Sequence, residues 1–167
     1  MKKIILTAVL SLTLLIAFGS IANAQMAREG TFSGTAVLSA TLTTLTMGEE
    51  RLQMNYDLTG AFLNDANEGF LHKTSFHDVG ALHAVNGVME NDHSFCVFSD
   101  KDGDKLYLTH EATGSLANAK RFWKWVGGTG KYTGIQGGGE WYWVSLPPVV
   151  EGTLIGLWEI KGNYKLP

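Results

Sequence analysis

Apolar and polar residues alternate with a period of two along most of this chain. Between residues 51 and 58, every second residue from Leu52 to Leu58 is apolar or aromatic, and the residues between them are polar or charged. Such alternation is typical of a β-strand with one buried face. Similar runs, bounded by Gly, Asn or Asp, predict strands at residues 32–45, 51–58, 70–76, 80–89, 94–98, 105–111, 121–126, 140–145 and 153–164.

The spacing of these runs predicts the fold class. Short strands at regular intervals, separated by turn signals, are typical of an all-β barrel or sandwich. Closing the sheet removes its exposed edges, which favours a barrel for a chain of this size. We therefore expect a single small antiparallel β-barrel of about eight strands.

The first 24 residues have the pattern of a secretory signal peptide. Two lysines precede a mostly apolar run at residues 4–18, and A-N-A at residues 22–24 forms a small-x-small cleavage site. Cleavage after Ala24 leaves residues 25–167 as one domain. We expect bacterial export to the periplasm or the medium. No later apolar run is long enough for a membrane helix.

Charge and cysteine content narrow the range of partners. The formal charge is −3, and it becomes −5 without the two lysines of the signal peptide. An acidic chain argues against a nucleic-acid partner, which favours a basic surface, and against electrostatic membrane binding. Cys96 is the single cysteine, so no internal disulfide forms. We interpret it as a small buried apolar residue, with a reactive thiol or an intermolecular bridge as the alternatives.

The glycine-rich segment at residues 125–143 predicts a sharp corner between strands. A phosphate-binding loop needs Ser or Thr after its Gly-Lys pair and then a helix. Here Tyr132 follows Gly130-Lys131, and the alternation around Trp141 indicates a strand. Glycine permits positive φ and close strand approach, and we expect the flanking tryptophans to fill the space it leaves.

The motif G-G-T-G-K-Y-x-G-I-x-G at residues 127–137 resembles the signature of the allene oxide cyclase barrel group. This group includes plant allene oxide cyclases, plant dirigent proteins and many uncharacterised secreted bacterial proteins. The bacterial branch has patterns similar to C-V-F-S-D-x-D-G-D-K at residues 96–105 and to the G-N-Y-K-L-P ending at residues 162–167. The resemblance covers most of the chain for that branch, and little beyond the corner for the plant enzymes.

The resemblance implies an eight-stranded barrel with an apolar lumen, and a homo-oligomer, since plant relatives are often trimers. Plant allene oxide cyclases isomerise a reactive fatty-acid epoxide, and dirigent proteins direct the coupling of phenoxy radicals. No motif here aligns the catalytic residues of either, so none is carried over. A shared corner indicates a shared fold more than a shared function.

Aromatic side chains are the candidate ligand-binding residues. An aromatic lining with a few polar groups is typical of a small-molecule site. Barrel packing or a subunit interface is the alternative interpretation of the same side chains. The candidates are Tyr56, Phe95, Tyr107, Trp123, Trp125, Trp141 and Trp143.

Glu111 and Arg51 are the candidate catalytic residues. A carboxylate in an apolar lumen would have a raised pKa and would act as an acid or base, and Glu111 ends a strand in phase with Tyr107. Arg51 begins its strand and would pair with a ligand carboxylate. The alternatives are an exposed charge at a strand end and a solvated strand start.

The sequence predicts no metal site and no cofactor. The five histidines form no H-x-H pair and no H-E-x-x-H helix, and no nucleotide, flavin or haem motif is present. Residues 100–104, D-K-D-G-D, predict a hairpin turn, with a calcium loop as the alternative. A nucleophile elbow is absent, while a pairing of Cys96 with a histidine stays open.

These observations favour an exported barrel that binds a small apolar or aromatic molecule, such as a fatty-acid derivative or a phenolic, in its lumen. A cofactor-free isomerase, cyclase or lyase acting on such a molecule is the first alternative. A structural or protein-binding barrel whose lumen is filled by side chains is the second.

Overall fold

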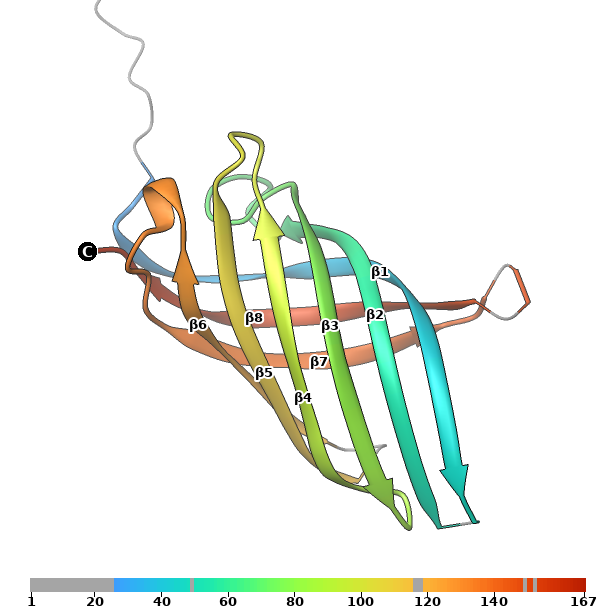
Figure 1. Cartoon of the computed structure of the whole chain (residues 1–167). Coiled ribbons are helices and arrows are strands. Elements are labelled where there is room, and N and C mark those ends of the chain that lie inside the picture. Colours follow the sequence, from blue (N-terminus) through green and yellow to red (C-terminus); the bar gives the residue numbers. More distant parts are fainter. Residues whose placement is uncertain (1–25, 49, 116–118, 149, 152) are drawn as a thin grey trace, which may run out of the picture.

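The computed structural model describes residues 26–48, 50–115, 119–148, 150–151 and 153–167. In it, eight antiparallel strands form a closed barrel, in which each strand pairs with the next and the last pairs with the first (Figure 1). The predicted all-β barrel is confirmed. The strands are β1 (Glu29–Met47), β2 (Arg51–Asn64), β3 (Thr74–Val85), β4 (Val88–Ser99), β5 (Lys105–Ser115), β6 (Lys120–Gly128), β7 (Gly138–Leu146) and β8 (Leu154–Lys165), with one 3-10 turn, η1 (Gly130–Tyr132).

The expected signal peptide lies outside the described residues. The part of the chain that is described has no helix with the length and apolarity of a membrane span.

Two strand predictions around β3 were wrong. Residues 70–73 form a loop in which Leu71 and Lys73 have positive φ, and a single strand then runs without a break to Val85. The chain reverses at Asn86-Gly87, where both residues have positive φ, of 52° and 73°. This is the two-residue Asn-Gly hairpin signal, which lies inside the run predicted as one strand at residues 80–89.

The barrel is open at one end because its strands separate there. Strand β6 pairs with β7 over only three residue pairs, from Phe122↔Glu140 to Lys124↔Gly138. Strand β8 pairs with β1 only as far as Ala40, although β1 continues beside β2 to Met47. In Figure 1 the β7–β8 hairpin therefore runs to the right, while β2 to β5 run downward. The lumen widens between these two parts.

Aromatic side chains fill the other end of the barrel. The rings of Phe70 and Tyr164 stack there with their centroids 3.8 Å apart, and Phe62 and Phe98 are almost completely buried. A filled lumen is the usual state of a small barrel. Within the described part of the lumen, the larger hollow lies at the end where the strands separate.

The glycine-rich segment is the predicted corner. The ring of Trp123 lies over Gly139 and Gly162, where an added Cβ would collide with it. Trp143 covers Gly156 in the same way. Glycine at these positions lets the indole rings pack directly against the backbone of the inner wall. The role of these glycines is therefore in packing.

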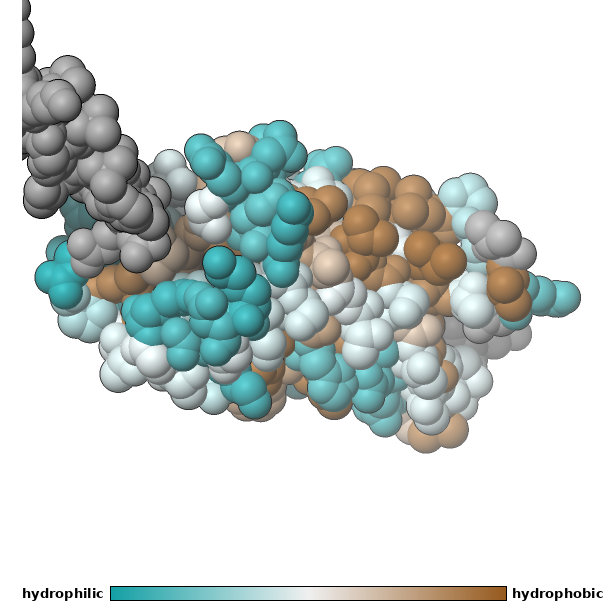
Figure 2. All heavy atoms as spheres, turned by 90° about the horizontal axis from the view of Figure 1, so that it is seen from above, coloured by the Kyte–Doolittle hydropathy of each residue, from teal (hydrophilic) through white to brown (hydrophobic). Residues whose placement is uncertain are grey.

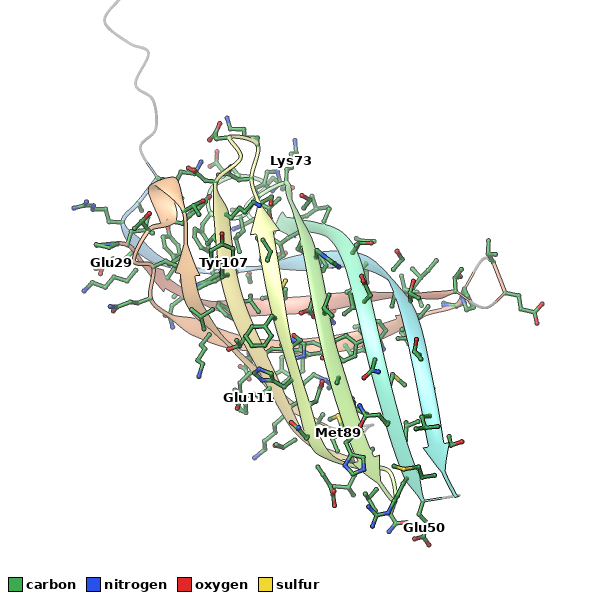
Figure 3. The ribbon with its side chains drawn as sticks, in the orientation of Figure 1. Glu29, Glu50, Lys73, Met89, Tyr107 and Glu111 are labelled. Carbon is green, nitrogen blue, oxygen red and sulfur yellow. The ribbon has the colours of Figure 1, made fainter. Side chains whose placement is uncertain are left out.

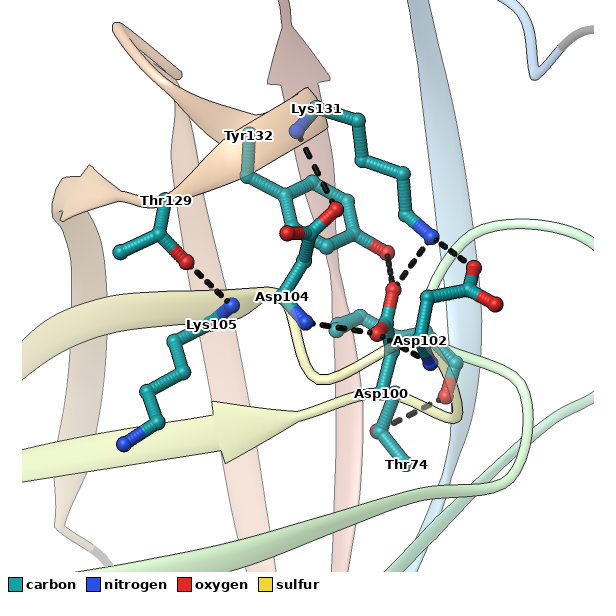
Figure 4. Close-up of polar contacts among 9 residues, drawn as sticks. Thr74, Asp100, Asp102, Asp104, Lys105, Thr129, Lys131 and Tyr132 are labelled. Carbon is teal, nitrogen blue, oxygen red and sulfur yellow. Dashed lines mark hydrogen bonds and ion pairs between the residues drawn. The ribbon is translucent and has the colours of Figure 1, made fainter.

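The corner also binds the predicted hairpin at residues 100–104 (Figure 4). Oδ1 of Asp100 accepts hydrogen bonds from the backbone N–H groups of Asp102, at 2.9 Å, and Asp104, at 3.0 Å. The Tyr132 hydroxyl donates to Oδ2 of Asp100, and Lys131 lies 2.6 Å from Asp102. In a calcium loop the carboxylates of Asp100 and Asp102 would bind the cation. Here they contact N–H, O–H and ammonium groups of the protein instead.

Candidate functional site

The hollow end of the lumen contains a cavity of about 260 Å³. All eight strands contribute side chains to its walls, which are mostly apolar. The apolar lining is Leu42, Met54, Leu58, Leu82, Met89 and Leu154; the aromatic lining is Trp141, Trp143 and Trp158; and the polar lining is Tyr56, Asp92, His110 and Arg121. This composition is typical of a small-molecule site, and the volume lies just below the usual range of about 300–1,000 Å³.

A row of residues across four strands forms the floor of the cavity. The register pairs Tyr56 of β2 with Gly80 of β3, Gly80 with Ser94 of β4, and Ser94 with His110 of β5. All four belong to the inner face. Gly80 has no side chain, so the Tyr56 ring lies across it, and an added Cβ would collide with that ring. The Tyr56 hydroxyl therefore reaches side chains on β4 and β5, two and three strands away.

Hydrogen bonds join these groups into one network. The Tyr56 hydroxyl donates to Oδ1 of Asp92 at 2.7 Å and lies 3.0 Å from Nε2 of His110. The Ser94 hydroxyl lies 2.8 Å from Nδ1 of the same imidazole. Oδ2 of Asp78 is 3.7 Å from Nδ1, and Asp78 is completely buried. The floor therefore holds two carboxyl groups, a phenol, a hydroxyl and an imidazole.

A bulge in β4 places Asp92 in the lumen. Ala84 pairs with Met89, but His83 pairs with Asn91, so one extra residue interrupts the ladder. An extra residue changes which side chains face inward. Met89 and Asp92 consequently both face the lumen, although a regular strand would put residues three apart on opposite faces.

Burial determines the electrostatics of the floor. Burial raises the pKa of Asp78, and the opposing effects of His110 and Ser94 offset this only in part. Neither carboxyl oxygen of Asp78 has a hydrogen-bond partner among the described residues. Burial, and next the nearby Asp92 carboxylate, raise the pKa of Tyr56 far above its ordinary value. Tyr56 is therefore a hydrogen-bond donor at neutral pH.

Arg121 is the cation of the cavity wall. Its guanidinium carbon lies 5.0 Å from the centroid of the Trp141 ring, within cation–π range. Burial lowers the pKa of Arg121, and the attraction of Asp92 opposes that effect. The cavity thus carries positive and negative groups on otherwise apolar walls.

The seven candidate ligand-binding residues divide between two faces of the wall. Tyr56, Trp141 and Trp143 line the cavity. Trp123 and Trp125 are buried deeper in the lumen, around a void of about 20 Å³. Phe95 and Tyr107 lie outside the lumen, and Phe95 is 63 % exposed. The position of Tyr107 on β5 is marked in Figure 3.

The two candidate catalytic residues do not lie in the lumen. Glu111 is exposed on the outer face of β5, because its neighbour His110 faces inward and alternate residues face opposite ways (Figure 3). Glu111 does lie on the same face of β5 as Tyr107, as predicted, but this is the outer face of the barrel. Arg51 is exposed at the start of β2. The acid–base groups of the lumen are instead Asp78, Asp92 and His110.

Cys96 is buried, as interpreted from the sequence, and burial raises its pKa well above the usual range. Among the described histidines, only His110 belongs to the cavity lining. His77 instead lies on the outer face, 2.9 Å from Asp57, and His83 lies 3.4 Å from Glu90. Within the described ranges, no group of three or more His, Cys, Asp or Glu residues is arranged to hold a metal ion.

The outer surface carries apolar side chains as well as polar ones. Figure 2 shows one face of the molecule, with apolar side chains gathered toward the β7–β8 turn. Rows of paired outer residues contribute to such surface, because Val37 pairs with Leu157 and Leu157 pairs with Val144. Val37 is 47 % exposed.

No protein-family model matches the chain. No curated protein matches its sequence. Among solved structures, the pterocarpan synthase dirigent protein GePTS1 is similar with 14% sequence identity and a TM-score of 0.47, over 87% of this chain and 97% of that chain. The eight-stranded barrel implied by the sequence resemblance is the barrel observed.

Proposed function

We propose that this protein binds a small, largely apolar or aromatic molecule with one polar group in the open half of its lumen. The observation that carries the proposal is the cavity of about 260 Å³, which has apolar and aromatic walls and polar groups on one side. Apolar walls favour the body of a ligand through the hydrophobic effect, and the polar groups orient it.

The division of the lumen supports binding over a purely structural role. Packed aromatic rings such as Phe62 and Phe98 fill one end, and this end supplies the stability of a closed core. At the other end the same inner face carries shorter or more flexible side chains, including Met54, Leu82 and Met89. A barrel with only a structural role has no need for a hollow end that contains buried polar groups.

Calorimetric titration of the purified protein tests the proposal. The ligands are decanoic acid, as a fatty-acid derivative, and 4-propylphenol, as a phenolic. We expect saturable binding of at least one of them, with a negative heat-capacity change from apolar burial. Absence of binding for both would count against the proposal.

Two leucine variants in β1 locate the binding site. Leu42 lines the cavity, whereas Leu45 is 60 % exposed on the other face of the same strand. Leu42→Trp would fill part of the cavity and should weaken binding about tenfold or more, which corresponds to about 1.4 kcal/mol. Leu45→Trp makes the same chemical change outside the lumen and should leave binding unchanged.

Export and assembly stay proposals from the sequence. We expect a periplasmic or secreted protein, processed after Ala24, and N-terminal sequencing of the exported product would test this. We also expect a homo-oligomer, and light scattering of the processed protein would measure its mass.

A further inference from the structure

The polar cluster on the cavity floor is larger than recognition of an apolar molecule requires. Asp78, Asp92 and His110 are each at most 6 % exposed. Burying carboxyl groups reduces stability unless they are fully paired, and both oxygens of Asp78 lack a hydrogen-bond partner among the described residues. Titratable groups gathered in a cleft at such a cost are typical of a site that carries out chemistry.

Asp92 is the carboxylate that borders the cavity. The hydroxyl of Tyr56 holds its Oδ1 at 2.7 Å. Because the pKa of Tyr56 is raised, the proton in this hydrogen bond stays on the phenol. The phenol therefore does not protonate Asp92, whose carboxyl group lines the cavity.

His110 positions Tyr56 for this role. The hydroxyl proton of Tyr56 points to Asp92, so the 3.0 Å contact with His110 is made by an N–H at Nε2, with the Tyr56 oxygen as acceptor. In the neutral imidazole, Nδ1 then accepts the hydrogen bond from Ser94 at 2.8 Å. Tyr56 and His110 are thus positioning residues, which fix the orientation of the Asp92 carboxylate.

Arg121 and Trp141 place a positive charge and a hydrogen-bond donor in the same wall as the Asp92 carboxyl group. The guanidinium of Arg121 is a positive charge beside the cavity. The indole N–H of Trp141 is a buried donor without a partner among the described residues. Fixed donors and cations in a water-poor site stabilise a negative charge that develops on a ligand oxygen.

From this arrangement we infer that the lumen is a proton-transfer site for apolar ketones, with Asp92 as the catalytic base and Arg121 as the group that stabilises the enolate oxygen. The inference rests on the proposed function, because the ketone must first enter the cavity.

The step is balanced without a cofactor. Asp92 accepts a proton from the carbon next to the carbonyl, and the C–H bond breaks. Its electron pair forms the C=C bond of the enolate, while the C=O π electrons move to oxygen beside Arg121. Asp92 then returns a proton to the same carbon, or to the far carbon of a neighbouring double bond. The second outcome isomerises an unsaturated ketone with no oxidation or reduction.

Hydrogen–deuterium exchange of 2-tetralone measures this step. The ketone is incubated with the protein in D2O, and proton NMR follows the loss of the C1 hydrogens. We expect an acceleration over buffer of about 10²-fold or more, as is typical of general acid–base catalysis. Tryptophan quenching by 2-tetralone, recorded on the same samples, measures binding separately.

Matched variants assign the exchange to Asp92. Asp92→Asn should abolish the acceleration while 2-tetralone still quenches the tryptophans. Glu111→Gln makes the same carboxylate-to-amide change on the outer face and should leave the exchange rate unchanged. If Asp92→Asn does not fold, Arg121→Met provides the second test, with slower exchange expected and binding retained.

The outcomes separate this inference from the proposed function. Binding of 2-tetralone without acceleration overturns the inference and leaves the binding function intact. Acceleration that persists in Asp92→Asn also overturns it. Absence of both binding and exchange contradicts the inference together with the function on which it rests.

Discussion

The side chain of Tyr56 lies across Gly80, its cross-strand partner, and so reaches Asp92, two strands away, and His110, three strands away. Glycine inside a strand usually weakens the strand, because it adds conformational entropy to the unfolded chain and packs no side chain. At this position it creates the space in which the polar floor of the cavity assembles.

Gly80→Ala should therefore disturb the floor. The new Cβ would collide with the Tyr56 ring and with Cβ of Ser94, so Tyr56 would move away from Asp92. We expect a loss of stability of about 1–3 kcal/mol, as for other overpacked cores. Urea unfolding measures this loss. Gly30→Ala is the matched control, because its Cβ would make only ordinary contacts, the nearest at 3.4 Å from Tyr164. Equal stability changes in the two variants would contradict the role assigned to Gly80.

Asp78→Asn should change how stability depends on pH. Burial raises the pKa of Asp78 in the folded protein, so the folded state holds this proton more tightly than the unfolded state. The contribution of such a group is full below the unfolded pKa, about 4, and is lost as the pH rises through the folded pKa. Asp78→Asn removes this loss, so the variant should be more stable than the wild type at neutral pH.

Urea unfolding of both proteins between about pH 4 and pH 7.5 tests this sign. The charged and titratable groups that interact with Asp78 are present in both proteins; they are His110, Asp92, His77, Tyr56 and Cys96. The difference between the two pH profiles therefore reports on Asp78. Parallel profiles would show that burial of this carboxyl is fully compensated.

Lys131→Met should weaken the contact between the corner and the β4–β5 hairpin. Burial alone would raise the pKa of Asp100, but hydrogen bonds from Lys131 and from the Asp102 N–H outweigh burial and lower it. A lowered pKa stabilises the fold above the unfolded pKa, and that stability is lost as the pH falls through the folded pKa. Without Lys131, acid unfolding should begin at a higher pH, and the neutral protein should lose about 1 kcal/mol.

Acid titration followed by tryptophan fluorescence measures this shift. Lys101→Met removes the same charge from an exposed position in the same hairpin and serves as the control. An acid midpoint that moves equally in both variants would indicate a general effect of net charge.

The period-two alternation sufficed to predict the barrel because closure leaves every strand with an inner and an outer face. The inward position of Trp141 and Trp143 follows from the same rule. On β5 the same alternation gives Leu106, Leu108 and Ala112 the inner face, and His110 is in phase with them. The hypothesis of a lumenal Glu111 rests on its phase with Tyr107, whose ring lies on the outer face.

The rest of the floor depends on features that alternation does not describe. The β4 bulge turns Asp92 inward, and no local composition marks it. The contacts of Tyr56 depend on a register across four strands. The Asn86-Gly87 turn, by contrast, was present in the sequence as a hairpin signal, and applying it would have placed β3 and β4 correctly.

The most direct test of the central claim is an NMR titration of the indole N–H groups with 4-propylphenol or decanoic acid. Trp141, Trp143 and Trp158 line the cavity, whereas Trp125 lies at the filled end and donates to the backbone carbonyl of Asn163 at 3.3 Å. We predict that the first three resonances shift in a saturable manner and that Trp125 does not. Resonances that all stay unchanged, or a shift confined to Trp125, would contradict a ligand site in the open half of the lumen.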